Sequence, residues 1–396
     1  MVNRLNFYNP QFYAMEALIW LRNRKGMASR VYRAFENERN AYRLGDTINI
    51  RRPARFTAAA APASSFQDLK TGTVQVSLNQ FFEVPFQVTD LELAYGSERL
   101  ITDHLGPAVD ALGNNLDQFL YGQAAGVPHV VDLPGSVAST MPATLASMRQ
   151  IMVDNQLPQD GRPVHYMAAP TTVARCLGSS AFTQWQGAGT EGVSAQASGV
   201  LGRKFGFDFF ESQNGPVLQA DSVASISGTL TVSGSPLKNA TSVSLLTSAA
   251  QTAVLRKGMV VAITSGGLTY KYAVTADTAA SGNNWNNVPI SPPLRTDLSS
   301  ATWALVVTSA LSAGSSYTAD LVFHPNAIAL AMVPLPMHGA DMGARVFTAT
   351  DPDSGISVRA RLWYDARNAA VGVVLDMLYG GVLLDPDLAL RGVVRA

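Results

Sequence analysis

Between residues 222 and 322 the sequence repeats one pattern: TLTVSG (229–234), SVSLLT (242–247), MVVAIT (259–264), YKYAVTA (270–276) and WALVVTSAL (303–311). These runs are rich in β-branched and aromatic residues, and turn-forming stretches such as SGNNWNN and ISPPL separate them. Charge is scarce, with 8 charged residues in the whole stretch: Lys238, Arg256, Lys257, Lys271, Asp277, Arg295, Asp297 and Asp320. Several short strands at this spacing predict a small β-barrel or a sandwich.

The flanking sequence has a different texture, with helical and strand patterns in alternation. Before the β-rich stretch, helices are expected over 97–121, 141–155 and 170–178, and a Gly/Ser/Ala-rich loop over 179–199. After it, SVRARLWYD (357–365) and AAVGVVLDMLYGGVLLD (369–385) indicate long strands. The overall expectation is an α+β chain in which a separate β module is set within an α/β domain.

The segment 97–121 is predicted to be a long helix. Its apolar residues fall three or four positions apart, which places them on one helix face: Ile101, Leu105, Ala108, Leu112, Leu116 and Phe119. Pro107 leaves two alternatives. Inside a helix it would remove a hydrogen bond and kink the axis, whereas in the first turn it is well tolerated.

The N-terminal part of the chain indicates an arm followed by an extended loop. Residues 10–43 have helical spacing without an internal proline. Residues 46–90 then predict one strand from Thr47 towards Phe56 and a second over 73–78, with the small-residue segment AAAAPASSFQDLKTG (58–72) between them. A two-stranded arm cannot bury both faces by itself, so it needs a partner surface from its own chain or another.

Charge is balanced over the chain but concentrated at its start. The net charge is zero, with 29 basic and 29 acidic residues, whereas residues 1–60 hold 11 Lys/Arg and 4 Asp/Glu, which gives 11 − 4 = +7. Three interpretations are open for this basic segment: a solvated helix face, a contact to nucleic acid or an acidic partner, or an arm packed on a neighbouring subunit. The candidate contact residues are Arg22, Arg24, Lys25, Arg30 and Arg33.

No motif in the sequence points to catalysis. The five histidines lack metal-ligand spacing among themselves and with Cys176, the single cysteine. Phosphate-loop, dinucleotide-binding and nucleophile-elbow motifs are missing from the sequence. We expect no enzyme activity, no cofactor and no metal. The sequence also has no apolar run of membrane-spanning length and no signal-peptide pattern at its start, so we expect no membrane association.

The order of these pieces resembles the tailed-phage major capsid proteins of the Hong Kong 97 fold. The segments that carry the resemblance cover most of the chain: GDTINIRRPARF (45–56), GTVQVSLNQFFEVPFQVTDLELA (72–94), ITDHLGPAVDALGNNLDQFLYGQ (101–123), GVLGRKFGFDFFESQNGPV (199–217), LVFHPNAIALAMVPLPM (321–337) and SGISVRARLWYDARNAAVGVVLDMLYGGVLL (354–384). The β module makes the chain similar to the subgroup typified by the coat protein of a short-tailed Salmonella phage.

The resemblance implies a division of the chain into five parts. These are an N-terminal arm (1–45), an extended loop and β-arm (46–90), a spine helix with the peripheral domain and the first part of the axial domain (91–221), an inserted β domain (222–322) and the rest of the axial domain (323–396). It implies an icosahedral shell of hexamers and pentamers, assembled in a host bacterial cytoplasm, that becomes the virion capsid around double-stranded DNA. The residues of the extended loop expected to touch a neighbouring subunit are Ala61, Pro62, Phe66, Asp68 and Lys70.

The sequence departs from the family pattern at two points. The extended loop begins by residue 46, which leaves no room for a cleaved scaffold-like region ahead of it, so we expect a separate scaffolding protein and a portal as partners. Lys70 lies in the loop where some members form a crosslink to asparagine, but no asparagine or catalytic glutamate can be assigned to that reaction. Pro107 lies where a straight spine helix is expected.

Three other kinds of protein compete with this interpretation. An encapsulin-like compartment shares the fold, but encapsulins lack the β module. A β-rich tail or surface protein would use residues 222–322 for adhesion. A hydrolase would need a site that no sequence motif reveals.

Overall fold

A computed structural model describes residues 10–23, 26–33, 47–51, 73–91, 104–134, 140–184, 195–219, 226, 229–299, 301–305, 316–337, 343–351 and 355–394. The chain forms two compact units. The first unit holds Met1–Asp117 and Ala329–Leu384, and the second holds Gln118–Ile328 and Asp385–Ala396. Both units therefore combine segments that are far apart in the sequence.

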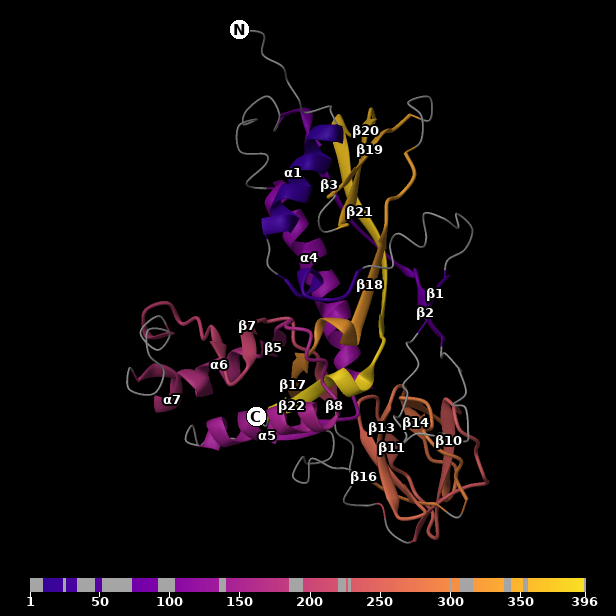
Figure 1. The fold of residues 1–396 in the computed structure, drawn as a ribbon. Helices are drawn as coiled ribbons and strands as arrows, with labels where there is room; N and C mark the ends of the chain where they lie inside the picture. Colours follow the sequence, from indigo (N-terminus) through magenta and orange to yellow (C-terminus); the bar gives the residue numbers. More distant parts are fainter. Residues whose placement is uncertain are drawn as a thin grey trace, which may run out of the picture. The chain divides into compact units, whose positions relative to one another are not determined.

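The first unit is built on a five-stranded sheet (Figure 1). The strand order is β18-β21-β20-β19. Strand β3 pairs antiparallel with β21 along the edge opposite β20, from Thr89 across from Ala370 to Gln80 across from Tyr379. The strands are β3 (Gln80–Thr89), β18 (Ile328–Val333), β19 (Arg345–Thr350), β20 (Ser357–Asp365) and β21 (Ala370–Leu383). The strands predicted over 357–365 and 369–385 are thus confirmed as β20 and β21.

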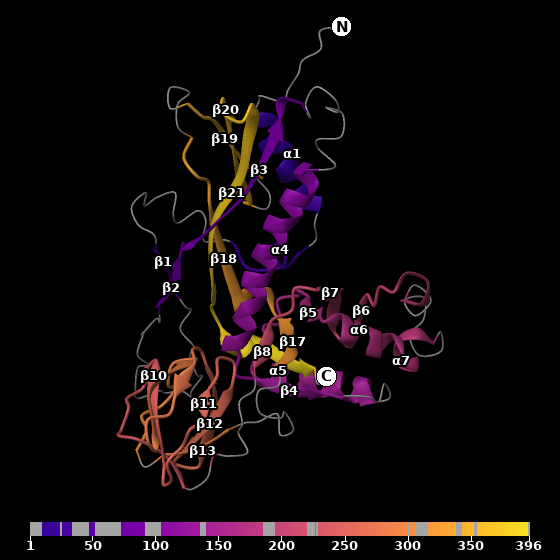
Figure 2. The same ribbon diagram turned by 180° about the vertical axis from the view of Figure 1, so that it is seen from behind.

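Two helices cover one face of this sheet, as Figures 1 and 2 show from opposite sides. Helix α1 (Pro10–Asn23) packs on β19 and β20 through Tyr13, Ala14, Ala17 and Leu21, which recur at helical spacing and are all buried. Helix α4 (Gly106–Gly122) lies alongside β21, where the Tyr379 hydroxyl donates a hydrogen bond to the Asn115 side chain. The boundary between the two units falls inside α4.

A two-stranded ribbon completes the described part of the first unit. Strands β1 (Thr47–Arg51) and β2 (Thr73–Ser77) are antiparallel, with Thr47 opposite Ser77. Ile48, Ile50 and Val76 point to one face of the ribbon and pack against Ala329 and Ala331 of β18. The ribbon therefore finds a partner surface for one face within its own chain.

The second unit contains a seven-stranded sheet in the order β4-β22-β17-β5-β7-β6, with β8 paired to β17. Its strands are β4 (Val130–Leu133), β5 (Val164–Ala168), β6 (Arg203–Lys204), β7 (Phe207–Glu211), β8 (Val217–Gln219), β17 (Ser316–Phe323) and β22 (Ala389–Val394). Helices α5 (Met141–Asp154), α6 (Pro170–Leu177) and α7 (Ser180–Thr183) accompany it. Met148 and Met152 of α5, Cys176 of α6 and Tyr166 and Phe207 of the sheet form one buried core.

A closed barrel occupies residues 230–305 of the second unit. Its pairing runs β10-β15-β13-β12-β16-β9 and closes where β9 pairs with β10. The barrel strands are β9 (Leu230–Val232), β10 (Ser242–Thr247), β12 (Val260–Ser265), β13 (Leu268–Val274), β15 (Asn284–Ser291) and β16 (Thr302–Leu305), and β11 (Val254–Leu255) pairs with β14 (Thr278–Ala279) beside them. Of the two expected architectures, barrel or sandwich, the structure therefore has the barrel.

The β module ends earlier than predicted. All of strand β17 except Phe323 lies within the predicted span 222–322, yet the strand pairs with β22, β5 and β8 of the seven-stranded sheet. Ser316 at its start pairs with Gln219 at the end of β8, so the chain leaves the sheet for the barrel and returns to it at neighbouring positions.

Two of the helix predictions need correction as well. The predicted helix 10–43 ends at Asn23 in the structure, and Gly26 has an extended backbone before a short 3-10 helix, Met27–Ser29. A Cβ on Gly26 would lie 2.6 Å from Asp117, whose Oδ1 accepts a hydrogen bond from the Met27 amide at 3.0 Å. A contact distant in sequence thus ends the arm helix. The predicted helix 97–121 has its α-helical part from Gly106, which places Pro107 in the first turn.

Candidate functional site

Only part of the predicted contact surface lies among the described residues. Arg30 and Arg33 are half-buried, and the Arg30 guanidinium donates to the Gly26 carbonyl oxygen at 3.0 Å. The backbone of Arg22 lies in α1, but its side chain lies outside the described residues. Four sets of positions fall outside them entirely: Arg24 with Lys25, Ala61 with Pro62, Phe66, and Asp68 with Lys70. Their contacts to neighbours or DNA stay predictions.

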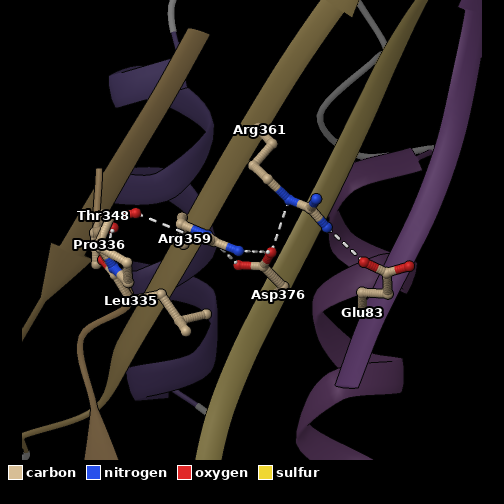
Figure 3. Close-up of polar contacts among 7 residues, drawn as sticks. All are labelled: Glu83, Leu335, Pro336, Thr348, Arg359, Arg361 and Asp376. Atoms are coloured by element: carbon tan, nitrogen blue, oxygen red, sulfur yellow. Dashed lines mark hydrogen bonds and ion pairs between the residues drawn. The ribbon is translucent and has the colours of Figure 1, made fainter. Parts of the chain in front are cut away.

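A charged network that the sequence analysis missed crosses three strands of the five-stranded sheet (Figure 3). Arg359 of β20, Asp376 of β21 and Glu83 of β3 stand opposite one another in the strand registers, and Arg361 lies two residues along β20 on the same face. The Arg359 guanidinium donates to both Asp376 oxygens, at 2.9 and 2.7 Å, and to the Pro336 carbonyl at 3.2 Å. Arg361 bridges Asp376, at 2.8 Å, and Glu83, at 2.5 Å.

Burial divides the network into a rigid centre and a solvated edge. The Asp376 side chain is 0% exposed and that of Arg359 is 9% exposed, whereas Arg361 is at 30% and Glu83 at 47%. A buried carboxylate needs compensation for lost hydration, and the bidentate Arg359 pair supplies it. The network therefore ties β3, from the first quarter of the chain, to strands from its last tenth.

The described residues contain no group of three His, Cys, Asp or Glu side chains that could hold a metal ion. Cys176 is buried, which raises the pKa of its thiol to about 12, so the thiol behaves as an apolar group in the core. Four histidines have separate partners: His129 with Asp387, His165 with Asp208, His324 with Asp160, and His104 stacked on Phe86. These side chains do not assemble into a reactive centre.

Asp320 of β17 is the most deeply buried acid of the second unit, at 0% exposure. Its carboxylate accepts hydrogen bonds from the Ala169 amide at 2.8 Å and from the Tyr166 hydroxyl at 3.0 Å. Because Ala169 is the N-cap residue of α6, Asp320 caps that helix from a neighbouring strand. Burial raises the pKa of Asp320 to about 6, and the hydrogen bond from Ala169 opposes this shift.

The raised pKa predicts an unusual pH dependence of stability. Between its unfolded and folded pKa values, Asp320 binds its proton more tightly in the folded chain, so the contribution of Asp320 to the free energy of unfolding should increase as pH falls from 7 to 4. Replacing Asp320→Asn removes this titration while keeping an acceptor for Ala169. We expect the change in unfolding free energy between pH 7 and 4 to differ by roughly 2–3 kcal/mol between the two proteins. Urea titrations at both pH values measure it, and equal pH dependences would contradict it.

Comparison with solved structures gives several matches over most of the chain. A structure from Mycobacterium phage Che8 is 14% identical and covers 92% of this chain and 90% of its own, with a TM-score of 0.49. The capsid structure of cyanophage P-SCSP1u is 12% identical over 89% of this chain and 84% of its own, with a TM-score of 0.48. A virus-like particle from Pyrococcus furiosus is 8% identical over 96% of this chain and 97% of its own, with a TM-score of 0.42. No protein-family model and no curated protein matches the sequence.

The structure adds polar residues that sequence reasoning did not single out. Asp376, Asp320 and Arg391 are each at most 1% exposed, and each lies in a β-strand next to apolar residues. That position was the available signal, because a charged residue in a fully buried strand requires a partner. What the sequence could not supply was the identity of those partners, which come from strands far away in the chain.

The described helices include none that is long and apolar enough to cross a membrane.

Proposed function

We propose that this chain is the major capsid protein of a tailed phage, which assembles into an icosahedral shell around double-stranded DNA. The observation that carries the proposal is the order of the elements along the chain. It runs from arm helix α1 through the β1–β2 ribbon and helix α4 to a sheet interrupted by a barrel, and it ends in strands that return to both sheets. This is the order that the resemblance to the Hong Kong 97 fold implies.

The barrel favours a phage coat protein over an encapsulin-like compartment, because encapsulins lack such a module. The barrel also argues against a tail or surface protein that uses it for adhesion. It is not one unit in a row of β modules, since β8 and β17 on either side of it pair within one mixed sheet. A shell subunit uses many modest contacts whose combined effect stabilises the closed particle.

Electron microscopy of the expressed full chain tests the proposal. We expect closed shells when a scaffolding protein is co-expressed, and particles with nucleic acid in the infected host. Shells filled with an enzyme would favour the encapsulin-like compartment, fibres or rings would favour a tail protein, and compact monomers under all conditions would contradict a shell function. Sedimentation velocity of the same samples gives the fraction assembled.

The loop residues Ala61, Pro62, Phe66, Asp68 and Lys70 are proposed to contact a neighbouring subunit. Deletion of residues 58–71 should abolish shells while leaving the melting temperature of the unassembled chain nearly unchanged, because the deleted segment has little apolar surface of its own to contribute. Shell yield and differential scanning calorimetry are the two measurements. Shells at normal yield would show that the loop is not an intersubunit contact.

The basic residues Arg22, Arg24, Lys25, Arg30 and Arg33 are proposed to face DNA, an acidic scaffold or an acidic neighbour. Replacing all five with Gln should reduce assembly or packaging, and added salt should deepen the defect because it screens the contacts that remain. A solvated helix face predicts little effect, since exposed charges contribute roughly 0–1 kcal/mol each. Assembly and DNA content at low and high ionic strength distinguish the two, and normal values at both salts would return the segment to a solvated face.

A further inference from the structure

The barrel is attached to the seven-stranded sheet by more than its two chain connections. Gln219 and Ser316, the last and first sheet residues on either side of it, are paired with one another and so form a single stem. A single point of attachment would allow the barrel to rotate relative to the seven-stranded sheet. Among the described residues, strand β13 of the barrel also lies beside the 3-10 helix Gln123–Gly126. Two polar contacts to the barrel come from residues 385–394 at the end of the chain, which are called the C-terminal clasp below.

We propose that the C-terminal clasp fixes the orientation of the barrel on the sheet, with Arg391 and Asp387 as its two contact points. The clasp consists of a 3-10 helix, Pro386–Leu388, and strand β22. Strand β22 lies between β17 and β4, where Arg391 is opposite Leu321 on one side and Val130 on the other. It joins the sheet only after the chain has passed through residues 329–384 of the first unit.

Arg391 is the first contact point. It is 1% exposed, and its guanidinium donates to the Gly258 carbonyl of the barrel at 2.5 Å and to the Ala124 carbonyl at 3.5 Å. Among the described residues no carboxylate pairs with Arg391, and its Nε has no partner. Burial of a cation without a counter-charge is costly, so an apolar residue would suit a purely space-filling role better. The guanidinium fork instead reaches carbonyls of two different elements.

The barrel side of this contact is shaped to receive the guanidinium. Gly258 lies in the turn between β11 and β12 with φ +92, and a Cβ there would come within 3.2 Å of both Arg391 Nη1 and Leu218 Cδ1. A side chain at this position would therefore be strained and would crowd the arginine. The apolar side chains of Ala125, Leu218, Tyr317, Ala319 and Val393 form a buried cluster on the same face of the sheet as Arg391.

Asp387 is the second contact point. Its Oδ1 pairs with the Arg295 guanidinium of the barrel, and His129 Nε2 lies 3.2 Å from the same oxygen. Burial opposes ionisation of Asp387, but His129 and Arg295 together hold its pKa at about 2, so the contact is charged over the physiological range. Arg295 is itself held on the barrel, because its amide donates to the Tyr272 hydroxyl at 3.3 Å and its guanidinium lies 5.8 Å from the Tyr270 ring.

The two contact points are near the same end of the barrel but on different elements. The Gly258 amide donates to the Val274 carbonyl, and Arg295 contacts Tyr272, so both lie beside the carboxyl end of β13. Together with the Gln219–Ser316 stem, these two polar contacts hold the barrel at three separate places, which is enough to define an orientation. The barrel is therefore expected to take its final place only when β22 has entered the sheet.

Distance measurements between two spin labels test the clasp. The labels are introduced by Leu268→Cys, 59% exposed on the barrel at the far end of β13, and Val153→Cys, 47% exposed on α5. Cys176 is buried and stays unlabelled. The unassembled full chain should give one narrow distance distribution. The double change Arg391→Met and Asp387→Asn should replace it with a broad one, while circular dichroism keeps the strand content of the barrel.

Two single variants complete the test: one leaves the clasp intact, and the other removes one clasp contact from the barrel side. Arg256→Met is the control. It breaks a solvent-exposed ion pair between two residues of the β domain, Arg256 and Asp277, and should leave the narrow distance distribution unchanged. Arg295→Met removes the second contact from the barrel side, where the side chain is 34% exposed, without disturbing the sheet. If the double variant fails to fold, broadening in Arg295→Met supports the clasp. A distribution as narrow as that of the unmodified chain in Arg295→Met, or in a folded double variant, overturns it.

Discussion

Replacing Asp376→Ala is expected to lower the free energy of unfolding of the five-stranded sheet by about 3–5 kcal/mol, because it leaves the buried Arg359 guanidinium without its counter-charge. Because only 9% of the Arg359 side chain is exposed, its guanidinium cannot be hydrated in place of the lost carboxylate. Its remaining hydrogen bond is to the Pro336 carbonyl. The loss therefore comes mostly from an orphaned cation rather than from a missing attraction.

Two further variants separate these causes. Glu83→Ala removes an acid from the solvated edge of the same network and should cost roughly 0–1 kcal/mol, because exposed ion pairs contribute little. The double replacement Arg359→Met and Asp376→Leu removes both buried charges and should recover most of the loss of Asp376→Ala. Native-state hydrogen exchange of the β20 and β21 amides measures each effect locally. If the double variant is as unstable as Asp376→Ala, packing rather than charge burial is responsible.

Replacing Trp285→Ala is expected to destabilise the barrel by about 3–5 kcal/mol, because it removes the largest fully buried side chain and leaves a cavity. The Trp285 ring meets the Trp303 ring edge-on at 5.6 Å, and its Nε1 donates to the Ala253 carbonyl at 3.0 Å. The variant therefore loses apolar contacts on one side and leaves a buried carbonyl without its donor on the other.

The same experiment shows whether the barrel unfolds as a unit of its own. Protection of the β10, β13 and β15 amides should fall in Trp285→Ala, whereas the β5 and β17 amides of the sheet should keep theirs. Leu237→Ala is the matched control, since Leu237 is 70% exposed on the barrel surface and its loss should change stability by less than about 0.5 kcal/mol. Equal loss of protection in sheet and barrel would contradict an autonomous β domain.

The elements that could be predicted from the sequence are those with strong local patterns. Low charge and repeated β-branched runs indicated the barrel, and the apolar spacing from Leu105 to Phe119 indicated helix α4. The boundary of the β domain was predicted at residue 322, which takes in most of strand β17 (Ser316–Phe323) of the seven-stranded sheet. Its true partners, β22 and β5, are far away in sequence, and no local pattern identifies them.

The same reason explains the incomplete prediction of the polar sites. The arm helix was predicted to continue past Asn23 because the following stretch contains no proline, whereas the hydrogen bond from the Met27 amide to Asp117 spans 90 residues. The sequence analysis did not single out Asp376 or Asp320, and the partners of both acids lie on elements far away in the sequence. Local sequence therefore does not identify how these buried acids are compensated.

The pairing of Gln219 with Ser316 also bears on how such a chain gains or loses a domain. A gene segment encoding residues 220–315 can be exchanged at this one junction without altering the order of the strands on either side, since Gln219 and Ser316 already lie opposite one another in the sheet. The exchange has one requirement. A chain without the barrel would retain a cation at Arg391 that has lost the Gly258 carbonyl, so a shortened protein, natural or engineered for display of a foreign domain, should carry an apolar residue at that position.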